Sequence, residues 1–137
     1  MGLRRKSREL ALQFLFGHDL QGRFSDPDCV AQALDVFGQC FEVENKPFDH
    51  AKYLITGLIG HCAEIDELLS ASSHNWRLER MSLVDRNILR IAVFEMQHCA
   101  DVPAQVAINE ALEIAKRYSV RDSVGFINGI LDSISGR

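Results

Sequence analysis

Hydrophobic side chains recur along this chain at intervals of three and four residues, the spacing that gathers them on one face of an α-helix. The pattern predicts six main helices. Three have both ends marked, over residues 3–17, 49–69 and 82–98, and a fourth runs from 27 to a break at 45–47. The last two begin at 103 and 121, and a short turn or helix is expected at 76–78. No stretch keeps the two-residue alternation, bounded by turn residues, that is typical of a β-strand. The chain is therefore expected to have an all-α fold.

Local signals mark where several of these helices begin. Ser25, Asp26 and Pro27 combine a capping side chain, an acid and an early proline, which together are typical of a helix start. Ser82 is expected to cap the helix over 82–98, with Asp85 in its first turn. The polar segment 70–75 separates the helices into two groups. We therefore expect a single domain, 1–137, made of two sub-bundles over about 1–70 and 75–137.

Composition narrows the classes of function. Hydrophobic residues make up 47% and charged residues 25% of the chain, which is ordinary for a globular protein. No apolar run approaches the roughly 20 residues that span a bilayer. The basic N-terminus leads into an amphipathic helix rather than the apolar core of a signal peptide. We therefore expect a cytoplasmic protein with no membrane partner. The net charge of −4 argues against a wholly basic nucleic-acid-binding surface.

No metal site or catalytic motif is expected. The four cysteines form no CxxC pair, so free, buried thiols are predicted. Cys62 and Cys99 follow His61 and His98, but adjacent residues on a helix point about 100° apart. Neither pair chelates one ion easily, and a site would need the two helices to meet there. Glycine-rich phosphate loops, Gly-x-Ser-x-Gly and His-Glu-x-x-His are also missing. We therefore expect no cofactor and no enzymatic activity.

Positive charge is concentrated at the N-terminus. Four of the fifteen basic residues are Arg4, Arg5, Lys6 and Arg8. A basic helix tip of this kind can contact phosphates, and arginine adds planar, forked hydrogen bonding. The alternative is a solubilising N-terminal segment.

A second cluster of chemically informative residues lies near the other end of the chain. Single-stranded RNA is usually bound by stacking bases on aromatic rings and reading their edges with amides and carboxylates. Glycines there would let a backbone approach closely, although each costs a helix about 1 kcal/mol relative to alanine. For the aromatic residue the alternative is core packing, and for the glycines it is close helix crossing. The cluster consists of Tyr118, Asp122, Gly125, Phe126, Asn128 and Gly129.

Three segments together resemble the NusB family of transcription antitermination factors. They are RRKSRELALQFLF near the start, LVDRNILRIAVFEM in the middle and VPAQVAINEALEIAKRYSVRDSVGFINGILD near the end. The resemblance spans essentially the whole chain and implies a helical domain of two three-helix bundles. It also implies a role in antitermination at ribosomal RNA operons. There the chain would bind boxA RNA together with a small-subunit ribosomal protein, NusE, and act with RNA polymerase and other Nus factors.

The resemblance further implies which residues carry these contacts. RNA would be bound by Arg4, Arg5, Lys6, Arg8, Gln13, Lys116, Tyr118, Asp122, Phe126 and Asn128, and the ribosomal protein by Glu79, Arg80, Asp85 and Arg86. Acids in the second set suit a basic partner, because complementary charge orients docking. Some family members carry a lysine where this chain has Gly125, so weaker RNA binding is expected here.

Two alternatives remain open. The same helical module occurs at the N-terminus of ribosomal RNA cytosine methyltransferases, but no cofactor-binding domain follows Arg137 in this sequence. Some family members also self-associate through the face that would bind RNA, so a homodimeric structural module is the third interpretation.

Overall fold

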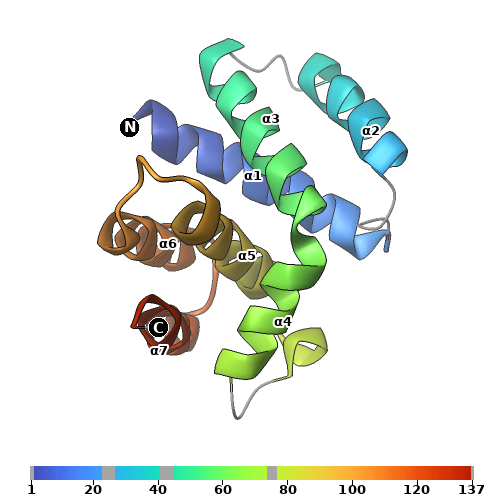
Figure 1. Cartoon of the computed structure of the whole chain (residues 1–137). Helices are drawn as coiled ribbons and strands as arrows, with labels where there is room; N and C mark the ends of the chain where they lie inside the picture. Colours follow the sequence, from blue (N-terminus) through green and yellow to red (C-terminus); the bar gives the residue numbers. More distant parts are fainter. Residues whose placement is uncertain (1, 23–26, 41–44, 74–76, 137) are drawn as a thin grey trace. The chain divides into compact units, whose positions relative to one another are not determined.

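Every regular element that the structure describes is a helix. The computed structural model describes residues 2–22, 27–40, 45–73 and 77–136, and the all-α prediction is confirmed for them. In chain order (Figure 1) the elements are α1 (Leu3–Leu20), α2 (Pro27–Cys40), α3 (Asn45–Gly60), α4 (Cys62–Ser72), the 3₁₀-helix η1 (Leu78–Arg80), α5 (Leu83–His98), α6 (Ala104–Tyr118) and α7 (Arg121–Ser135).

The chain divides into two compact units, Met1–Gly60 and His61–Arg137. In the first unit, α3 packs against both α1 and α2. Its core is formed by the apolar stripes of the three helices, in which the largest fully buried side chains are Leu15, Leu34, Leu54, Ile55 and Leu58. Burial of these stripes is the dominant favourable contribution to folding.

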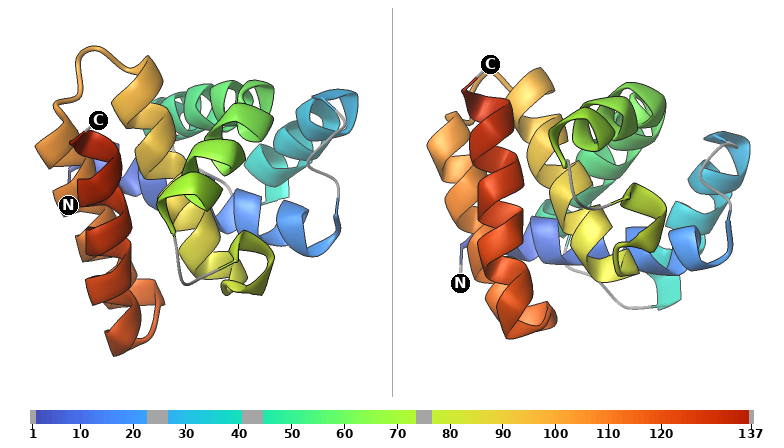
Figure 2. Two further views of the ribbon diagram at one scale, coloured as in Figure 1. Left: turned by 60° about the horizontal axis from the view of Figure 1, so that its bottom comes forward. Right: turned by 90° about the horizontal axis from the view of Figure 1, so that it is seen from below.

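In the second unit, α5 is the central element. It contacts α4, α6 and α7, and Figure 2 shows α7 lying beside α6 and α5 in both views. Every residue from Asn87 to Glu95 is buried, because a helix covered on several sides has almost no solvent face. The largest buried apolar side chains of the unit are Ile65, Leu69, Leu89, Ile108, Ile127 and Leu131.

The predicted helix over 49–69 is wrong in extent, since it consists of two helices. The chain leaves helical geometry at His61, with φ −117° and ψ 14°, and the division between the two compact units follows Gly60. The apolar repeat continues across the break, so periodicity could not reveal it. The segment 45–47, expected to be a break, is instead the first turn of α3, where a proline is tolerated.

Other helix boundaries agree better with the sequence. The Ser82 hydroxyl accepts a hydrogen bond from the backbone N–H of Asp85 at 3.1 Å, which confirms the predicted cap. The first helix runs through Gly17 and ends at Leu20. The predicted start at Ser25 and Asp26 and the aromatic residue Trp76 lie outside the described residues. Among the helices that are described, none combines the length and apolar character needed to cross a bilayer.

Candidate nucleic-acid interface

The basic residues of α1 occupy different faces of that helix. Arg8 is only 4% exposed, whereas Arg4 is exposed and Arg5 and Lys6 are partly exposed. Because little of the Arg8 side chain reaches solvent, the structure does not support a direct phosphate contact there. Arg4 shares a hydrogen bond of 3.0 Å with Nε2 of His50, which ties its guanidinium to α3.

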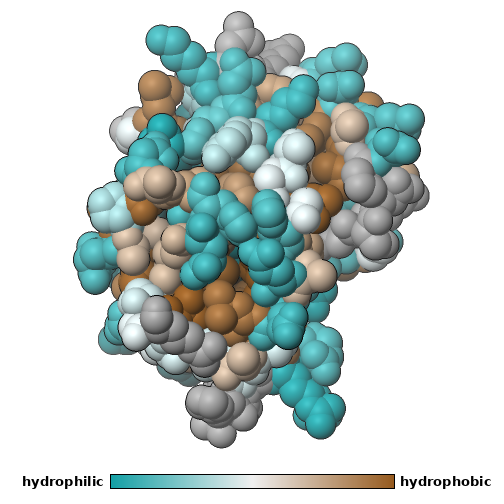
Figure 3. All heavy atoms as spheres, viewed as in Figure 1, coloured by the Kyte–Doolittle hydropathy of each residue, from teal (hydrophilic) through white to brown (hydrophobic). Residues whose placement is uncertain are grey.

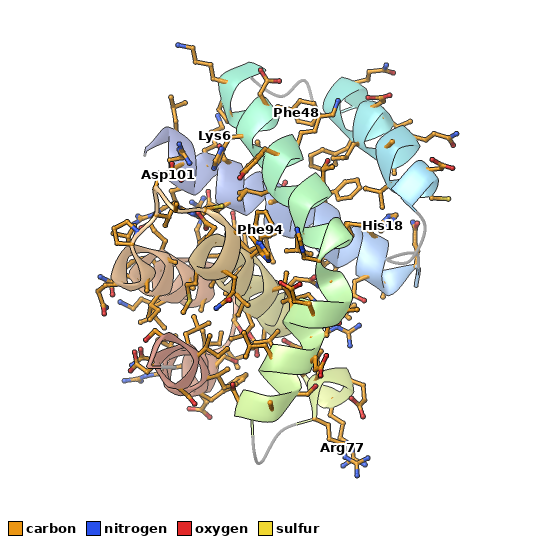
Figure 4. All side chains as sticks on the ribbon, in the orientation of Figure 1. Lys6, His18, Phe48, Arg77, Phe94 and Asp101 are labelled. Carbon is orange, nitrogen blue, oxygen red and sulfur yellow. The ribbon has the colours of Figure 1, made fainter. Side chains whose placement is uncertain are left out.

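Lys6 and Gln13 share the solvent side of α1. They are seven residues apart, close to two full helical turns, and Gln13 is exposed. Figure 4 labels Lys6 near the N-terminal end of α1. Gln13 also lines an open hollow of about 310 Å³ between α1 and α2, together with Phe14 and Phe37. The solvent side of α1 therefore presents a cation and an amide beside a partly apolar depression.

Asp122, Phe126 and Gly129 follow one another on the solvent side of α7. Their spacing of four and then three residues places them on one helix face, and Gly125 is exposed next to them. A Cβ atom added at either glycine would come within 4 Å of no other side chain or neighbouring helix among the described residues. Close helix crossing therefore does not explain these two glycines. They leave the backbone of α7 open to a ligand.

Asn128 lies on the opposite flank of this open face from Phe126. The two residues are separated by about 200° around the helix axis, and both side chains are partly exposed. They can reach the same ligand only if it crosses α7 over the glycines. The open face of α7 thus has the aromatic ring of Phe126 on one flank and the amide of Asn128 on the other.

The C-terminal turn of α6 contributes the next aromatic group. The guanidinium of Arg117 lies 5.5 Å from the ring centroid of Tyr118, within the range of a cation–π contact. Lys116 pairs with Glu113 at 3.2 Å on the exposed side of the same helix. Arg117 was not among the residues expected to bind RNA, although its position directly beside an aromatic residue in the sequence was an available signal.

Asp85 holds the turn between α6 and α7 in place. Its carboxylate accepts one hydrogen bond from the Ser119 hydroxyl and another from the Ser123 hydroxyl at 2.7 Å. The residue is only 5% exposed. Both carboxylate oxygens are thus engaged inside the second unit, and this geometry does not support Asp85 as a direct protein-partner contact. It positions Tyr118, which immediately precedes the turn.

The other residues expected to bind a protein partner are more accessible. Glu79 and Arg80 are exposed on η1, which Leu78 anchors through its buried side chain. Arg86 is partly exposed in the first turns of α5. These three residues offer charges of both signs on the second unit.

The condition that the sequence analysis set for a metal site, that the two histidine-bearing helices meet, is fulfilled in the structure. The segments that carry His61 and His98 do meet, and their imidazole rings stack with centroids 3.9 Å apart. Glu64 completes a group of three residues able to hold a metal ion. The packing of α4 on α5 therefore brings the two histidines together. The candidate ligand group pairs each histidine with the other, and not with the cysteine that follows it in the sequence.

Comparison with known proteins gives one consistent result. The model of the NusB family matches residues 5–136. The chain is 49% identical over 135 residues to the transcription antitermination protein NusB of Desulfosudis oleivorans, across 98% of this chain and 86% of that protein. It is similar to the solved structure of T. maritima NusB, with a TM-score of 0.81, 37% identity and coverage of 98% and 91% of the two chains. A structure of the antitermination factors NusB and NusE in complex with dsRNA shares the fold, with a TM-score of 0.84, 23% identity and coverage of 99% and 98%.

Proposed function

The chain belongs to the NusB family, and we propose that it is an RNA-binding transcription antitermination factor. Together with the small-subunit ribosomal protein NusE it binds the boxA element of nascent ribosomal RNA operon transcripts. Together with other Nus factors, this assembly helps RNA polymerase to read through terminators. The protein acts in the cytoplasm, by binding rather than by catalysis.

The observation that carries the proposal is the solvent face of α7. Phe126 supplies an aromatic surface, Asp122 a carboxylate, and Gly125 and Gly129 leave the helix backbone uncovered. Unpaired bases stack on aromatic rings and are read at their edges by polar side chains. A strand that crosses the glycines reaches Phe126 on one flank and Asn128 on the other.

The end of α6 supports binding of a further nucleotide. Arg117 covers one side of the Tyr118 ring, and an arginine plane is itself a surface on which a base stacks. Lys116, exposed at the same helix end, provides a cation for a phosphate. Asp85 does not touch the RNA but fixes the turn from which these residues project.

On the first unit, phosphate contacts come from Arg4, Arg5 and Lys6, and Gln13 follows about two turns further along α1. Each phosphate neutralised by a cation releases counterions, so affinity falls with salt by about 0.7 log units per log unit for each contact with a single strand. Gly125 leaves the backbone of α7 open and brings no side-chain charge to this face. Binding at α7 therefore depends more on stacking and close approach than on charge.

The second unit binds the ribosomal protein through Glu79, Arg80 and Arg86. Ribosomal proteins are basic, so the acid on η1 favours encounter, while the arginines pair with acids on the partner and fix orientation. Reversing the charge of Glu79 with lysine is expected to slow association most strongly at low salt. Stopped-flow mixing over a range of salt concentrations measures this change.

The test is a titration of labelled boxA-like RNA followed by fluorescence anisotropy, with and without the ribosomal protein. We expect the pair to bind more tightly than this chain alone, and a scrambled RNA to bind more weakly. Phe126→Ala removes a stacking surface worth about 1–3 kcal/mol, which is about a 5- to 150-fold loss of affinity. Phe16→Ala removes a ring that is 38% exposed on the C-terminal half of α1 and is the matched control, expected to leave affinity unchanged.

The same titration separates the alternatives. Equal binding of boxA-like and scrambled RNA would exclude specific readout and favour a general RNA-binding module like that of ribosomal RNA methyltransferases. No RNA binding under any condition, combined with a dimer in light scattering, would support the homodimeric structural module instead.

A further inference from the structure

Three metal-ligating side chains come together in the second unit, and the proposed RNA interface uses none of them. His61 is the N-cap of α4, Glu64 lies in the first turn of the same helix, and His98 is the last residue of α5. One ligand atom from each lies within 4.8 Å of the others. Phe94, labelled in Figure 4, lies one turn before His98 on α5 and packs near both imidazoles.

The carboxylate of Glu64 contacts one ring nitrogen of each imidazole. One oxygen is 2.7 Å from Nε2 of His98, and the other is 3.6 Å from Nδ1 of His61. The two rings stack with an interplanar angle of 22°. The hydrogen bond with His98, assisted by the charges of both histidines, lowers the pKa of Glu64 below its usual range. All three ligands thus converge on one small region at the helix ends.

These separations suit a zinc ion. Zinc binds imidazole nitrogen at about 2.0–2.1 Å and carboxylate oxygen at about 2.0–2.2 Å, so two of its tetrahedral ligand atoms are about 3.3–3.5 Å apart. The 3.6 Å between His61 and Glu64 is already near that value. The 2.7 Å between His98 and Glu64 is that of a hydrogen bond, so a metal that takes the place of the shared proton requires this pair to open by only about 0.6–0.8 Å.

We propose that His61, Glu64 and His98 form a binding site for one divalent transition-metal ion, with zinc as the best match. Two imidazoles and a carboxylate are a zinc ligand set in which water completes the coordination. His98 stands at the C-terminal end of α5, where the helix dipole favours a cation. On binding, Nε2 of His98 gives its proton to solvent, Nδ1 of a neutral ring takes one up in its place, and metal–nitrogen and metal–oxygen bonds replace the hydrogen bond.

The site is open to a hydrated ion. The side chains of His61, Glu64 and His98 are 43%, 58% and 26% exposed. Figure 3 shows apolar atoms exposed where Figure 1 draws α4, α5 and α7, framed by polar ones. A bound ion cross-links the start of α4 to the end of α5, two elements of the second unit that already pack together.

The experiment is calorimetric titration of Zn²⁺ into the full chain after removal of metal by a chelator, at about pH 7.5, above the ordinary histidine pKa. We expect one zinc per chain. His98→Ala, His61→Ala and Glu64→Gln are each expected to weaken binding by at least about 10-fold, since even the loss of an outer hydrogen-bond partner costs a metal site that much. Circular dichroism of each variant verifies that the helices remain.

Cys62→Ser is the matched control, because Cys62 adjoins His61 and thiolates also bind zinc. It is expected to leave zinc affinity unchanged, and Co²⁺ in the wild-type chain is expected to show no thiolate charge-transfer band. Long-range nitrogen NMR of the wild-type chain should show zinc-dependent shifts at His61 and His98, a readout that requires no variant. Absence of zinc binding at millimolar zinc, or loss of binding in Cys62→Ser but not in His98→Ala, would overturn the proposal.

Discussion

Replacing Gly125 and Gly129 of α7 by alanine is expected to stabilise the protein and, at the same time, to weaken its binding to RNA. Both glycines lie inside the helix Arg121–Ser135, where each costs about 1 kcal/mol relative to alanine. A Cβ at either position meets no other side chain or helix among the described residues. No packing penalty opposes the gain, so the double variant should be more stable by about 1–2 kcal/mol.

The same methyl groups stand where the proposed RNA strand crosses α7. They hold the strand away from the helix backbone and shift the base that stacks on Phe126. Losing about half of a stacking contact worth 1–3 kcal/mol amounts to a loss of about 1 kcal/mol, or roughly fivefold in affinity. Stability is measured by urea unfolding followed by circular dichroism, and affinity by anisotropy of labelled boxA-like RNA in the presence of the ribosomal protein.

Gly38 of α2 provides a matched control. There a Cβ would lie 2.8 Å from Cζ of Phe48 on α3, a ring labelled in Figure 4. The helical gain of Gly38→Ala is opposed by an overpacking cost of about 1–3 kcal/mol, so this variant should not stabilise. Unchanged RNA affinity in the stabilised α7 variant would refute the idea of close approach. A loss of stability in that variant would refute the open geometry itself.

Other substitutions separate surface contacts from internal ones. Lys6→Ala should reduce the salt dependence of RNA binding by about one phosphate contact and leave stability unchanged. The side chain of Arg8 is buried, so Arg8→Ala should instead lower the urea midpoint of unfolding. Asp85→Ala removes the acceptor of two hydroxyl groups and should cost about 2–4 kcal/mol in urea unfolding, and also weaken RNA binding; an effect on RNA alone would contradict its internal role. The buried Arg90 donates two hydrogen bonds, of 2.8 and 2.9 Å, to the carboxylate of Asp66. Asp66→Ala removes that carboxylate. It should destabilise the chain by about 2–4 kcal/mol, and a change within experimental error would show that this ion pair contributes nothing.

Much of the fold was predictable from the sequence by itself. The repeat of apolar residues every three to four positions identified the helical class and most helices, because this signal is local and survives in any arrangement of the helices. The cap at Ser82 was equally local and is confirmed by its hydrogen bond. The motifs near both ends and in the middle were also sufficient to indicate the family, which the comparisons bear out.

What only the tertiary structure decided are the properties that depend on neighbours distant in the chain. Arg4 and Arg8 look alike in the sequence, yet one is exposed and the other buried. Likewise, Gly125 is open to solvent whereas Gly38 faces an aromatic ring. His61 and His98 are far apart in sequence and become neighbours because α4 packs on α5. Residue spacing determines which side chains share a helix face, but helix packing determines what that face meets.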